Sequence, residues 1–153
     1  MTVREVMTGA PKTCTPDTTL AAAANLMWEA DCGVLPVVDE GELVGIVTDR
    51  DMFIALGKRN TRAAHVRVGA VATTNVSTCA PDDDVETAVA AMKQARVRRL
   101  PVIDADRKLV GIVSINDIVL AAGRRKAVRN EDVVDALQAI CAPHRHDTDD
   151  AAA

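Results

Sequence analysis

Residues 35–39 read Leu-Pro-Val-Val-Asp, and residues 100–104 read Leu-Pro-Val-Ile-Asp. Around these two segments, residues 3–57 align with residues 68–123 at an offset of 65, which becomes 66 near Lys108, and about 22 of about 55 aligned pairs are identical. Units of this length are each too small to bury an adequate core. We therefore expect two similar units that pack on each other about a pseudo-twofold axis, so that any site in the seam between them occurs twice.

Each unit also carries a hydroxyl residue followed three positions later by an aspartate. Residues 45–48 read Gly-Ile-Val-Thr with Asp51 downstream, and residues 111–114 read Gly-Ile-Val-Ser with Asp117 downstream. Such a pair, taken alone, indicates a capping box at the start of a helix. Because it occurs twice in register, we expect two helix N-termini near the seam, where N–H groups favour phosphate and a carboxylate suits ribose hydroxyls.

The pattern of β-branched runs and alanine-rich stretches predicts strand, helix, strand, strand, helix in each unit. In the first unit we expect a strand at 12–14, a helix at 18–30 capped by residues 15–17, strands at 34–38 and 43–47, and a helix from 49 to 56 that ends at Gly57. In the second unit the expected helices are 84–95 and 115–122. The fold class is α/β of the α+β type, with two β-α-β-β-α repeats packed through their sheets and one extra C-terminal helix.

The segments between and after the repeats differ from them in composition. We predict a first repeat at 1–57, a polar linker at 58–67, a second repeat at 68–123, a basic segment with a helix at 124–143, and a disordered tail at 144–153. The extra helix begins near Asn130, and its expected apolar stripe is Val133, Val134, Leu137, Ile140 and Cys141. It either covers the core of its own chain or swaps onto a partner chain.

Composition excludes several classes of function. The 153 residues are 48% hydrophobic and 26% charged, which is typical of one compact domain. With one Trp, one Phe, no Tyr and a net charge of −4, the chain lacks the stacking side chains and the basic charge of a nucleic-acid binder, so such a partner is not expected. No apolar stretch approaches the roughly 20 residues of a membrane span, and residues 1–8 do not resemble a signal peptide, so we expect a cytoplasmic protein.

Cysteine and histidine give no pattern of a metal or catalytic site. The cysteines Cys14, Cys32, Cys79 and Cys141 form no Cys-x-x-Cys pair, and Cys14 and Cys79 occupy equivalent repeat positions that favour small buried side chains. His65, His144 and His146 lie outside both repeats without a third ligand type nearby. We therefore predict no metal and no catalytic residues, so the protein is not expected to be an enzyme.

The two Leu-Pro-Val segments, followed by Gly-Ile-Val-Thr with Asp51 and by Gly-Ile-Val-Ser with Asp117, resemble the paired cystathionine-β-synthase (CBS) domains, often called a Bateman module. The resemblance covers nearly everything from Thr2 to Gly123. It implies that adenosine ligands bind in two clefts between the repeats, each with a ribose-binding aspartate from one repeat and adenine-holding strands from the other. It also implies a homodimer in which four repeats form a flat disc.

The two implied clefts differ in charge. The first would contain Thr48, Arg50, Asp51, Val76, Thr78, Val97, Arg98 and Arg99. Its three guanidinium groups suit phosphate, so we expect it to prefer AMP, ADP or ATP. The second would contain Pro11, Lys12, Thr13, Cys32, Gly33, Val34, Ser114, Asn116 and Asp117. Because Lys12 is its single nearby cation, it is expected to be empty or to take a less anionic ligand such as S-adenosylmethionine.

The sequence thus favours a regulatory module that binds adenine nucleotides, lacks catalytic activity and reports to a protein target that the sequence does not identify. One alternative is a structural interaction module whose clefts are vestigial. Another is a thiol-dependent redox protein that uses Cys14 or Cys32. Trp28 stands where the second repeat has Lys93, which indicates a packed surface, either a dimer contact or the resting place of the C-terminal helix.

Overall fold

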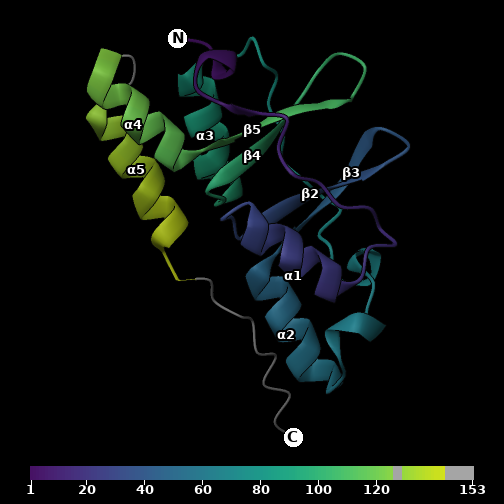
Figure 1. Cartoon of the computed structure of the whole chain (residues 1–153). Coiled ribbons are helices and arrows are strands. Elements are labelled where there is room, and N and C mark those ends of the chain that lie inside the picture. The colour runs from purple at the N-terminus through teal and green to yellow at the C-terminus, as the bar shows by residue number, and fades with distance from the viewer. Residues whose placement is uncertain (126–128, 144–153) are drawn as a thin grey trace, which may run out of the picture.

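The computed structural model describes residues 1–125 and 129–143. Two small sheets lie side by side, with α1 and α2 packed beside one of them and α3, α4 and α5 beside the other (Figure 1). The elements are β1 (Thr8–Gly9), α1 (Leu20–Glu29), β2 (Val34–Asp39), β3 (Glu42–Thr48), α2 (Asp49–Arg59), α3 (Val85–Ala95), β4 (Arg99–Ile103), β5 (Leu109–Ser114), α4 (Ile115–Arg125) and α5 (Asn130–Cys141), with short 3-10 turns at Val3–Glu5, Ala63–His65 and Val68–Ala70. The predicted α+β fold with two repeats is confirmed; the predicted tail, 144–153, lies outside the described residues.

Each repeat is built on an antiparallel hairpin, β2–β3 in the first and β4–β5 in the second. The β2–β3 turn has Glu40 and Gly41 at positive φ, 48° and 89°, as a two-residue hairpin turn requires. The β4–β5 turn is longer, and the Asp104 carboxylate accepts hydrogen bonds from the backbone N–H groups of Asp106 (3.0 Å) and Lys108 (2.9 Å). The change of repeat offset from 65 to 66 therefore falls in a turn and leaves the strand register intact.

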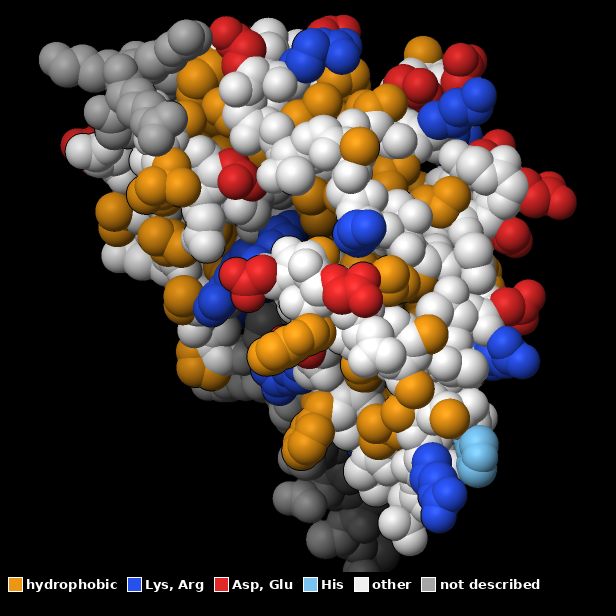
Figure 2. All heavy atoms as spheres, in the orientation of Figure 1, with side chains coloured by type: hydrophobic (Ala, Val, Ile, Leu, Met, Phe, Trp, Pro, Cys, Tyr) orange, Lys and Arg blue, Asp and Glu red, His pale blue; other side chains and the backbone are white. Residues whose placement is uncertain are grey.

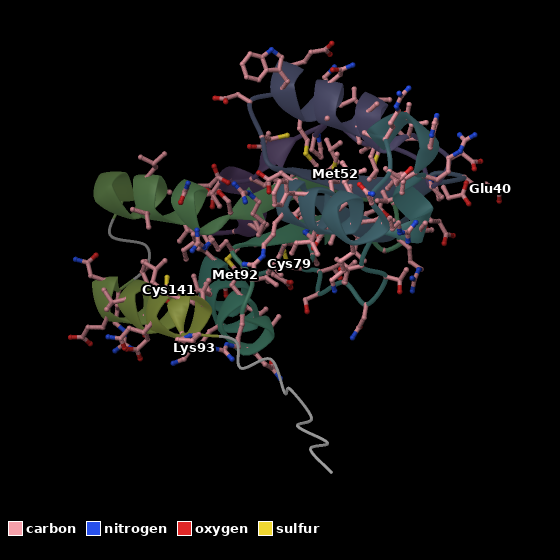
Figure 3. The ribbon with its side chains drawn as sticks, turned by 90° about the horizontal axis from the view of Figure 1, so that it is seen from below. Glu40, Met52, Cys79, Met92, Lys93 and Cys141 are labelled. Atoms are coloured by element: carbon pink, nitrogen blue, oxygen red, sulfur yellow. The ribbon has the colours of Figure 1, made fainter. Side chains whose placement is uncertain are left out.

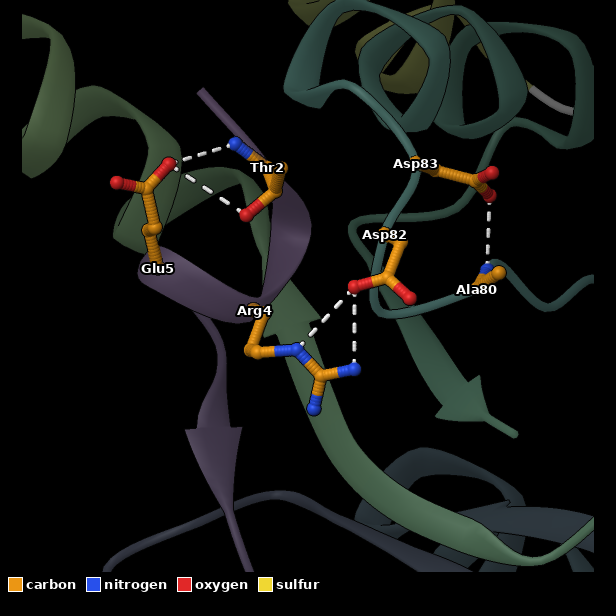
Figure 4. Close-up of polar contacts among 6 residues, drawn as sticks. All are labelled: Thr2, Arg4, Glu5, Ala80, Asp82 and Asp83. Carbon is orange, nitrogen blue, oxygen red and sulfur yellow. Dashed lines mark hydrogen bonds and ion pairs between the residues drawn. The ribbon is translucent and has the colours of Figure 1, made fainter.

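The first residues of each repeat cross over and pair with the opposite unit. Thr8 in β1 pairs with Ile112 in β5, and at the equivalent place Thr73 pairs with Ile46 in β3. Figure 4 shows the N-terminal segment beside residues 80–83, where Arg4 forms an ion pair with Asp82 at 3.1 Å. Each hairpin therefore pairs with a segment that belongs to the other repeat. These hydrogen bonds connect the two units along the seam.

The same crossing divides the two cores. Val3 is fully buried in the core of the second unit, while Val66 and Val68 are buried in the core of the first. Val66 belongs to the stretch 58–67 that composition marks as a linker, yet only 4% of its surface is exposed. That stretch therefore connects the repeats and also completes the first core.

Three helix boundaries differ from the sequence predictions. The N-cap of α1 is Thr19, whose hydroxyl accepts from the Ala22 N–H at 3.2 Å, so the helix begins after the predicted cap at residues 15–17. Helix α2 continues through Gly57 and ends where Asn60 takes a left-handed conformation, with φ 46°. Helix α4 extends to Arg125. Asparagine tolerates left-handed backbone, so Asn60 rather than Gly57 provides the helix end.

The predicted strand at residues 12–14 is reduced to one parallel bridge between Cys14 and Val37. The Cys14 N–H donates to the Pro36 carbonyl at 3.1 Å, and the Cys14 carbonyl accepts from the Val38 N–H at 2.8 Å. Extension of this ladder would need an N–H from residue 16 in one direction and from residue 36 in the other, and both are prolines, which have none. The ladder therefore cannot grow in either direction, and Cys14 is held in the core as a single point of contact.

Helix α5 packs against α3 and α4 of its own chain. It buries Val133, Ala136 and Ile140, and Asp135 forms an ion pair with Lys93 of α3 at 3.5 Å. Figure 3 shows Lys93 and Cys141 at this side of the molecule, next to α5. Val134 and Cys141 of the predicted stripe are exposed, because the helix turns its 133–136–140 face toward α3.

Candidate functional site

A cleft of about 1250 Å³ opens between the two units. It is lined by the starts of β2 and β4, the end of β3, the N-terminus of α2, residues 73–77 and the last residues of α5. The lining residues are Gly33, Val34, Ile46, Thr48, Asp49, Arg50, Asp51, Thr73, Asn75, Val76, Ser77, Ala95, Arg96, Val97, Arg98, Arg99, Ile140, Cys141, Ala142 and Pro143. Ligand pockets for small molecules occupy roughly 300–1,000 Å³, so this cleft has room for a nucleotide.

Asp51 enters the cleft wall from a complete capping box. Its Oδ2 accepts from the Thr48 N–H at 3.1 Å and from the Thr48 hydroxyl at 2.7 Å, and the Asp51 N–H donates to Thr48 Oγ1 at 3.1 Å. Among the described residues, Asp51 Oδ1 has no hydrogen-bond partner. The capping box therefore uses one carboxylate oxygen and leaves the other free to accept from hydroxyl groups.

Ser114 and Asp117 repeat this arrangement at the start of α4. Asp117 Oδ2 accepts from the Ser114 N–H at 2.8 Å and from its hydroxyl at 2.6 Å, and the Asp117 N–H donates to Ser114 Oγ at 3.2 Å. Both predicted capping boxes are thus present. The pair gives two helix starts of nearly identical geometry, of which only the α2 start lines the large cleft.

Four arginines line the cleft, and their side chains are engaged differently. No ion pair involves Arg50, Arg98 or Arg99 in the part of the chain that the structure describes. Arg96 is different, because its guanidinium donates to the carbonyls of Ala139 at 3.1 Å and Ala142 at 2.9 Å at the end of α5. Three guanidinium groups therefore remain available to an anion in the cleft.

Seven of the eight residues predicted for the first cleft line this cavity: Thr48, Arg50, Asp51, Val76, Val97, Arg98 and Arg99. The eighth, Thr78, lines a separate pocket of about 220 Å³ together with Val76 and Arg107. Whether the seven residues bind a ligand remains a proposal.

Two residues predicted for the second cleft, Gly33 and Val34, lie in the wall of the large cleft instead. Gly33 and Arg98 occupy equivalent repeat positions and line the same cavity, so the starts of β2 and β4 lie beside the pseudo-twofold axis. The other predicted members of the second cleft do not line this cavity: Pro11, Lys12, Thr13, Cys32, Ser114, Asn116 and Asp117.

The surroundings of Gly45 and Gly111, which are equivalent in the repeat, differ in the volume of one neighbouring side chain. A Cβ added to Gly111 would lie 2.5 Å from Met7 Sδ, whereas at the equivalent Gly45 the nearest side-chain atom is the Ala72 Cβ at 3.5 Å. Met7 and Ala72 are equivalent in the repeat. The second side therefore has a long thioether where the first side has only a methyl group.

Sequence reasoning missed two parts of the cleft. Asp49, at the first position of α2, has its Oδ2 2.8 Å from where a Gly33 Cβ would be, so the absence of a side chain at Gly33 leaves space for this carboxylate. At the positions equivalent to Gly33 and Asp49, the second repeat has Arg98 and Ile115. This difference between the repeats is a sequence signal for the close approach of Asp49 to Gly33. The wall at residues 140–143 lies outside both repeats, so internal similarity carried no signal for it.

The cysteines support the prediction that Cys14 and Cys79 are buried apolar residues. Both are free and buried, and burial raises the pKa of each thiol from 9.0 to about 11, with the charge of Asp83 adding to the effect at Cys79. Because the thiolate is the reactive form, both are poor nucleophiles at neutral pH. Cys32 is half-buried and donates to the Val34 carbonyl at 3.3 Å, while Cys141 is exposed.

Residues 1–125 and 129–143 contain neither a metal-binding cluster nor a helix that could span a membrane. Within them, no three or more His, Cys, Asp or Glu side chains gather where they could hold a metal ion. None of the helices found there is long and apolar enough to cross a bilayer. His144 and His146 lie outside this part of the chain.

The chain belongs to the CBS domain family, whose model matches residues 3–58 and 68–124. It is 33% identical over 144 residues to the CBS domain-containing protein YhcV of Bacillus subtilis, which covers 94% of this chain and 98% of YhcV. The resemblance seen in the duplicated motifs is therefore confirmed, and the chain is a CBS-domain pair.

Two solved structures with the same fold contain adenosine ligands. CBSX2 in complex with AMP is 32% identical, with a TM-score of 0.70, and the match covers 82% of this chain and 98% of CBSX2. The CBS domain pair of protein MJ0100, in complex with 5′-methylthioadenosine and S-adenosyl-L-methionine, is 30% identical, with a TM-score of 0.73 over 80% of this chain and 96% of that one. These structures have the fold described above together with adenosyl ligands.

Proposed function

We propose that this protein is a regulatory module that binds AMP, ADP or ATP in the large cleft and catalyses no reaction. The observation that carries the proposal is the cleft itself, where the free oxygen of Asp51 lies in the same wall as Arg50, Arg98 and Arg99. A carboxylate suits the hydroxyls of a ribose, and guanidinium groups suit phosphate. A cytoplasmic location fits a sensor of adenine nucleotides.

The related structures support an adenosyl ligand but leave its charge open, because one holds AMP and the other holds S-adenosyl-L-methionine. In this chain the three unpaired guanidiniums favour an anion and disfavour the sulfonium cation of S-adenosylmethionine. The second side of the molecule has Lys12 as its cation, with Met7 packed on Gly111. We therefore propose that nucleotides prefer the large cleft and that S-adenosylmethionine is the weaker ligand there.

Regulation would follow from the position of the cleft between the two units. A bound nucleotide would contact α2 of the first unit and the start of β4 of the second, so it would favour the relative arrangement that fits both. The size of the effect is limited by the difference in affinity for the two arrangements. A protein target would respond by binding one of the two arrangements more tightly than the other.

A panel of ligands tests this function by thermal unfolding. At about 100 times the dissociation constant, a ligand that binds only the folded protein adds about 2.7 kcal/mol, which raises the melting temperature of a chain of this size by several degrees. We expect AMP, ADP or ATP to produce this rise, and S-adenosylmethionine a smaller one. Mass spectrometry of small molecules released from the purified protein provides an independent readout. A flat response to every adenosyl ligand, with nothing released, contradicts the proposal.

The structural alternative, an interaction module with vestigial clefts, is favoured by one observation. Both capping boxes are closed by hydrogen bonds within the chain, so Asp51 and Asp117 each have a structural role that is independent of any ligand. The same ligand panel separates the two functions, because vestigial clefts give no rise in melting temperature. The arginines of the large cleft weigh against this alternative, since a purely structural wall has no need of three cations that form no ion pair among the described residues.

We further propose a homodimer that forms through α1 and α2. Hydrophobic side chains lie over these two helices on the face seen in Figure 2. Trp28 of α1 is 87% exposed, and Phe53 of α2 is 79% exposed. In the second unit, Lys93 stands at the position of Trp28 and contacts α5. Helix α5 covers this position in the second unit, and among residues 1–125 and 129–143 no helix covers it in the first, so a second copy of the chain is the occupant we expect.

Replacing Trp28 by lysine, the residue of the equivalent position, is expected to convert the dimer to a monomer at micromolar concentrations, because it removes the largest exposed apolar side chain and places like charges across a twofold contact. Sedimentation velocity measures the change. Leu120→Lys on α4 is the control, since Leu120 is also exposed but lies outside the proposed contact. Dimers that persist in Trp28→Lys, or that dissociate equally in Leu120→Lys, are inconsistent with this interface.

A further inference from the structure

The last turn of α5 forms part of the wall of the nucleotide cleft. Ile140, Cys141, Ala142 and Pro143 all line it, although α5 belongs to neither repeat. Two arginines of the cleft reach this wall. Arg96 donates to the Ala139 and Ala142 carbonyls, and Arg98 Nη2 lies 4.0 Å from Cys141 Sγ. The C-terminal end of α5 therefore contacts Arg96 and Arg98, which belong to the cationic segment that would contact an anion in the cleft.

This contact has a definite electrostatic sign. The carbonyl groups at the C-terminus of a helix carry a partial negative charge, and a guanidinium group that binds them is stabilising. Within the part of the chain that the structure describes, the α5 end is held in this way by Arg96, whose left-handed conformation, φ 55°, ends α3. A phosphate in the cleft would add negative charge beside the negative end of α5 and would attract the same guanidiniums.

We propose that docking of α5 and binding of an anionic nucleotide disfavour each other, so that α5 loosens from α3 when the cleft is occupied. This inference rests on the proposed nucleotide binding and names its regulatory output. By linkage, the factor by which a nucleotide favours the loosened helix equals the factor by which loosening favours the nucleotide. The output is the apolar face that α5 covers.

The apolar face that α5 covers would be the surface that a protein target detects. When docked, α5 buries Val133, Ala136 and Ile140 in the same core as Val89 and Met92 of α3. Loosening of α5 would expose apolar surface on both helices, which is the kind of surface that a protein target binds. The signal from the cleft would thus appear on the surfaces of α3 and α5 that pack against each other when α5 is docked.

Hydrogen exchange of the α5 amides, residues 130–141, tests the proposal on the full-length protein. We expect saturating ATP to accelerate their exchange about tenfold, within the usual range of coupling between sites. Adenosine, which has the same base and ribose without the charge, should leave the exchange of α5 unchanged. Calorimetry on the same samples reports whether each ligand is bound. This comparison requires no variant.

Two variants then assign the coupling to the α5 end. Arg96→Asn keeps a residue that tolerates the left-handed conformation and removes both hydrogen bonds to α5, so the response to ATP should be lost. Lys93→Ala removes the ion pair with Asp135 outside the cleft, so α5 should exchange faster at rest and still respond to ATP. The ratio of exchange rates with and without ATP separates these effects from a general loss of stability.

Each result decides between the two proposals. If calorimetry detects no binding of ATP, the proposed function fails and the coupling fails with it. If ATP binds but α5 exchanges at an unchanged or slower rate, the coupling alone is overturned. Equal acceleration by adenosine also overturns it, because the effect would then not arise from phosphate charge.

Discussion

Asp51→Ala is expected to weaken AMP binding about 100-fold, which corresponds to about 2.7 kcal/mol. In the proposed complex the free Oδ1 of Asp51 accepts hydrogen bonds from the ribose hydroxyls, and hydrogen bonds to a charged group contribute about 1.5–3 kcal/mol each. Isothermal titration calorimetry with AMP measures the loss. The neighbouring arginines remain in place in this variant, so the change reports on the sugar and not on the phosphate.

The duplication supplies a matched control for the structural side effect of this substitution. Asp117→Ala removes a capping box of nearly the same geometry from α4, so it should cost a similar 0.5–2 kcal/mol of unfolding free energy, roughly the value of a lost helix cap. Asp117 does not line the large cleft, so AMP binding there should change less than twofold. Equal losses of affinity in the two variants would show that the helix caps, and not the ribose contact, determine binding.

Much of the fold could be predicted because it repeats. In each repeat, the Leu-Pro-Val and Gly-Ile-Val segments are β-branched runs joined by a short turn, and together they form a hairpin. The hydroxyl and carboxylate spacing fixed the capping boxes, because the interaction is local and spans three residues. The cleft between the repeats was implied by the resemblance to paired CBS domains, and seven of the eight residues named for the first cleft line the large cleft.

The parts that could not be predicted depend on contacts between distant segments. Nothing in residues 6–9 indicates that β1 pairs with β5, because the partner lies more than a hundred residues away. The volume difference between Met7 and Ala72 has meaning only once both are seen against their glycines. The placement of Gly33 in the first cleft required the position of the pseudo-twofold axis, which the alignment of the repeats does not give.

Helix α5 illustrates the same limit. Its amphipathic pattern predicted a covered face but not which face, since the 133–136–140 set competes with the predicted stripe that includes Val134 and Cys141. Packing against α3 chose between them, and that choice placed residues 140–143 in the cleft wall. A site residue outside a repeat is thus found only by three-dimensional packing.

Arg98→Ala is expected to weaken ATP binding about tenfold and to leave adenosine binding within twofold. Arg98 has no carboxylate partner in the described structure, so its charge is available to the phosphates, and adenosine has none for it to contact. Since Arg98 is exposed, the effect should shrink as salt screens the charge, and calorimetry at two ionic strengths measures both quantities.

Arg62→Ala is the control for the change in net charge, because Arg62 is an exposed arginine in the connection between the repeats that does not line the large cleft. We expect it to leave ATP binding nearly unchanged. The difference between the two variants tests the proposed asymmetry of the molecule, in which one side has three guanidiniums without an ion-pair partner and the other has Met7 packed on Gly111 and Lys12 as its expected cation. Two ATP sites of equal affinity, both insensitive to Arg98→Ala, would contradict that asymmetry, since charge and volume would then not determine where the nucleotide binds.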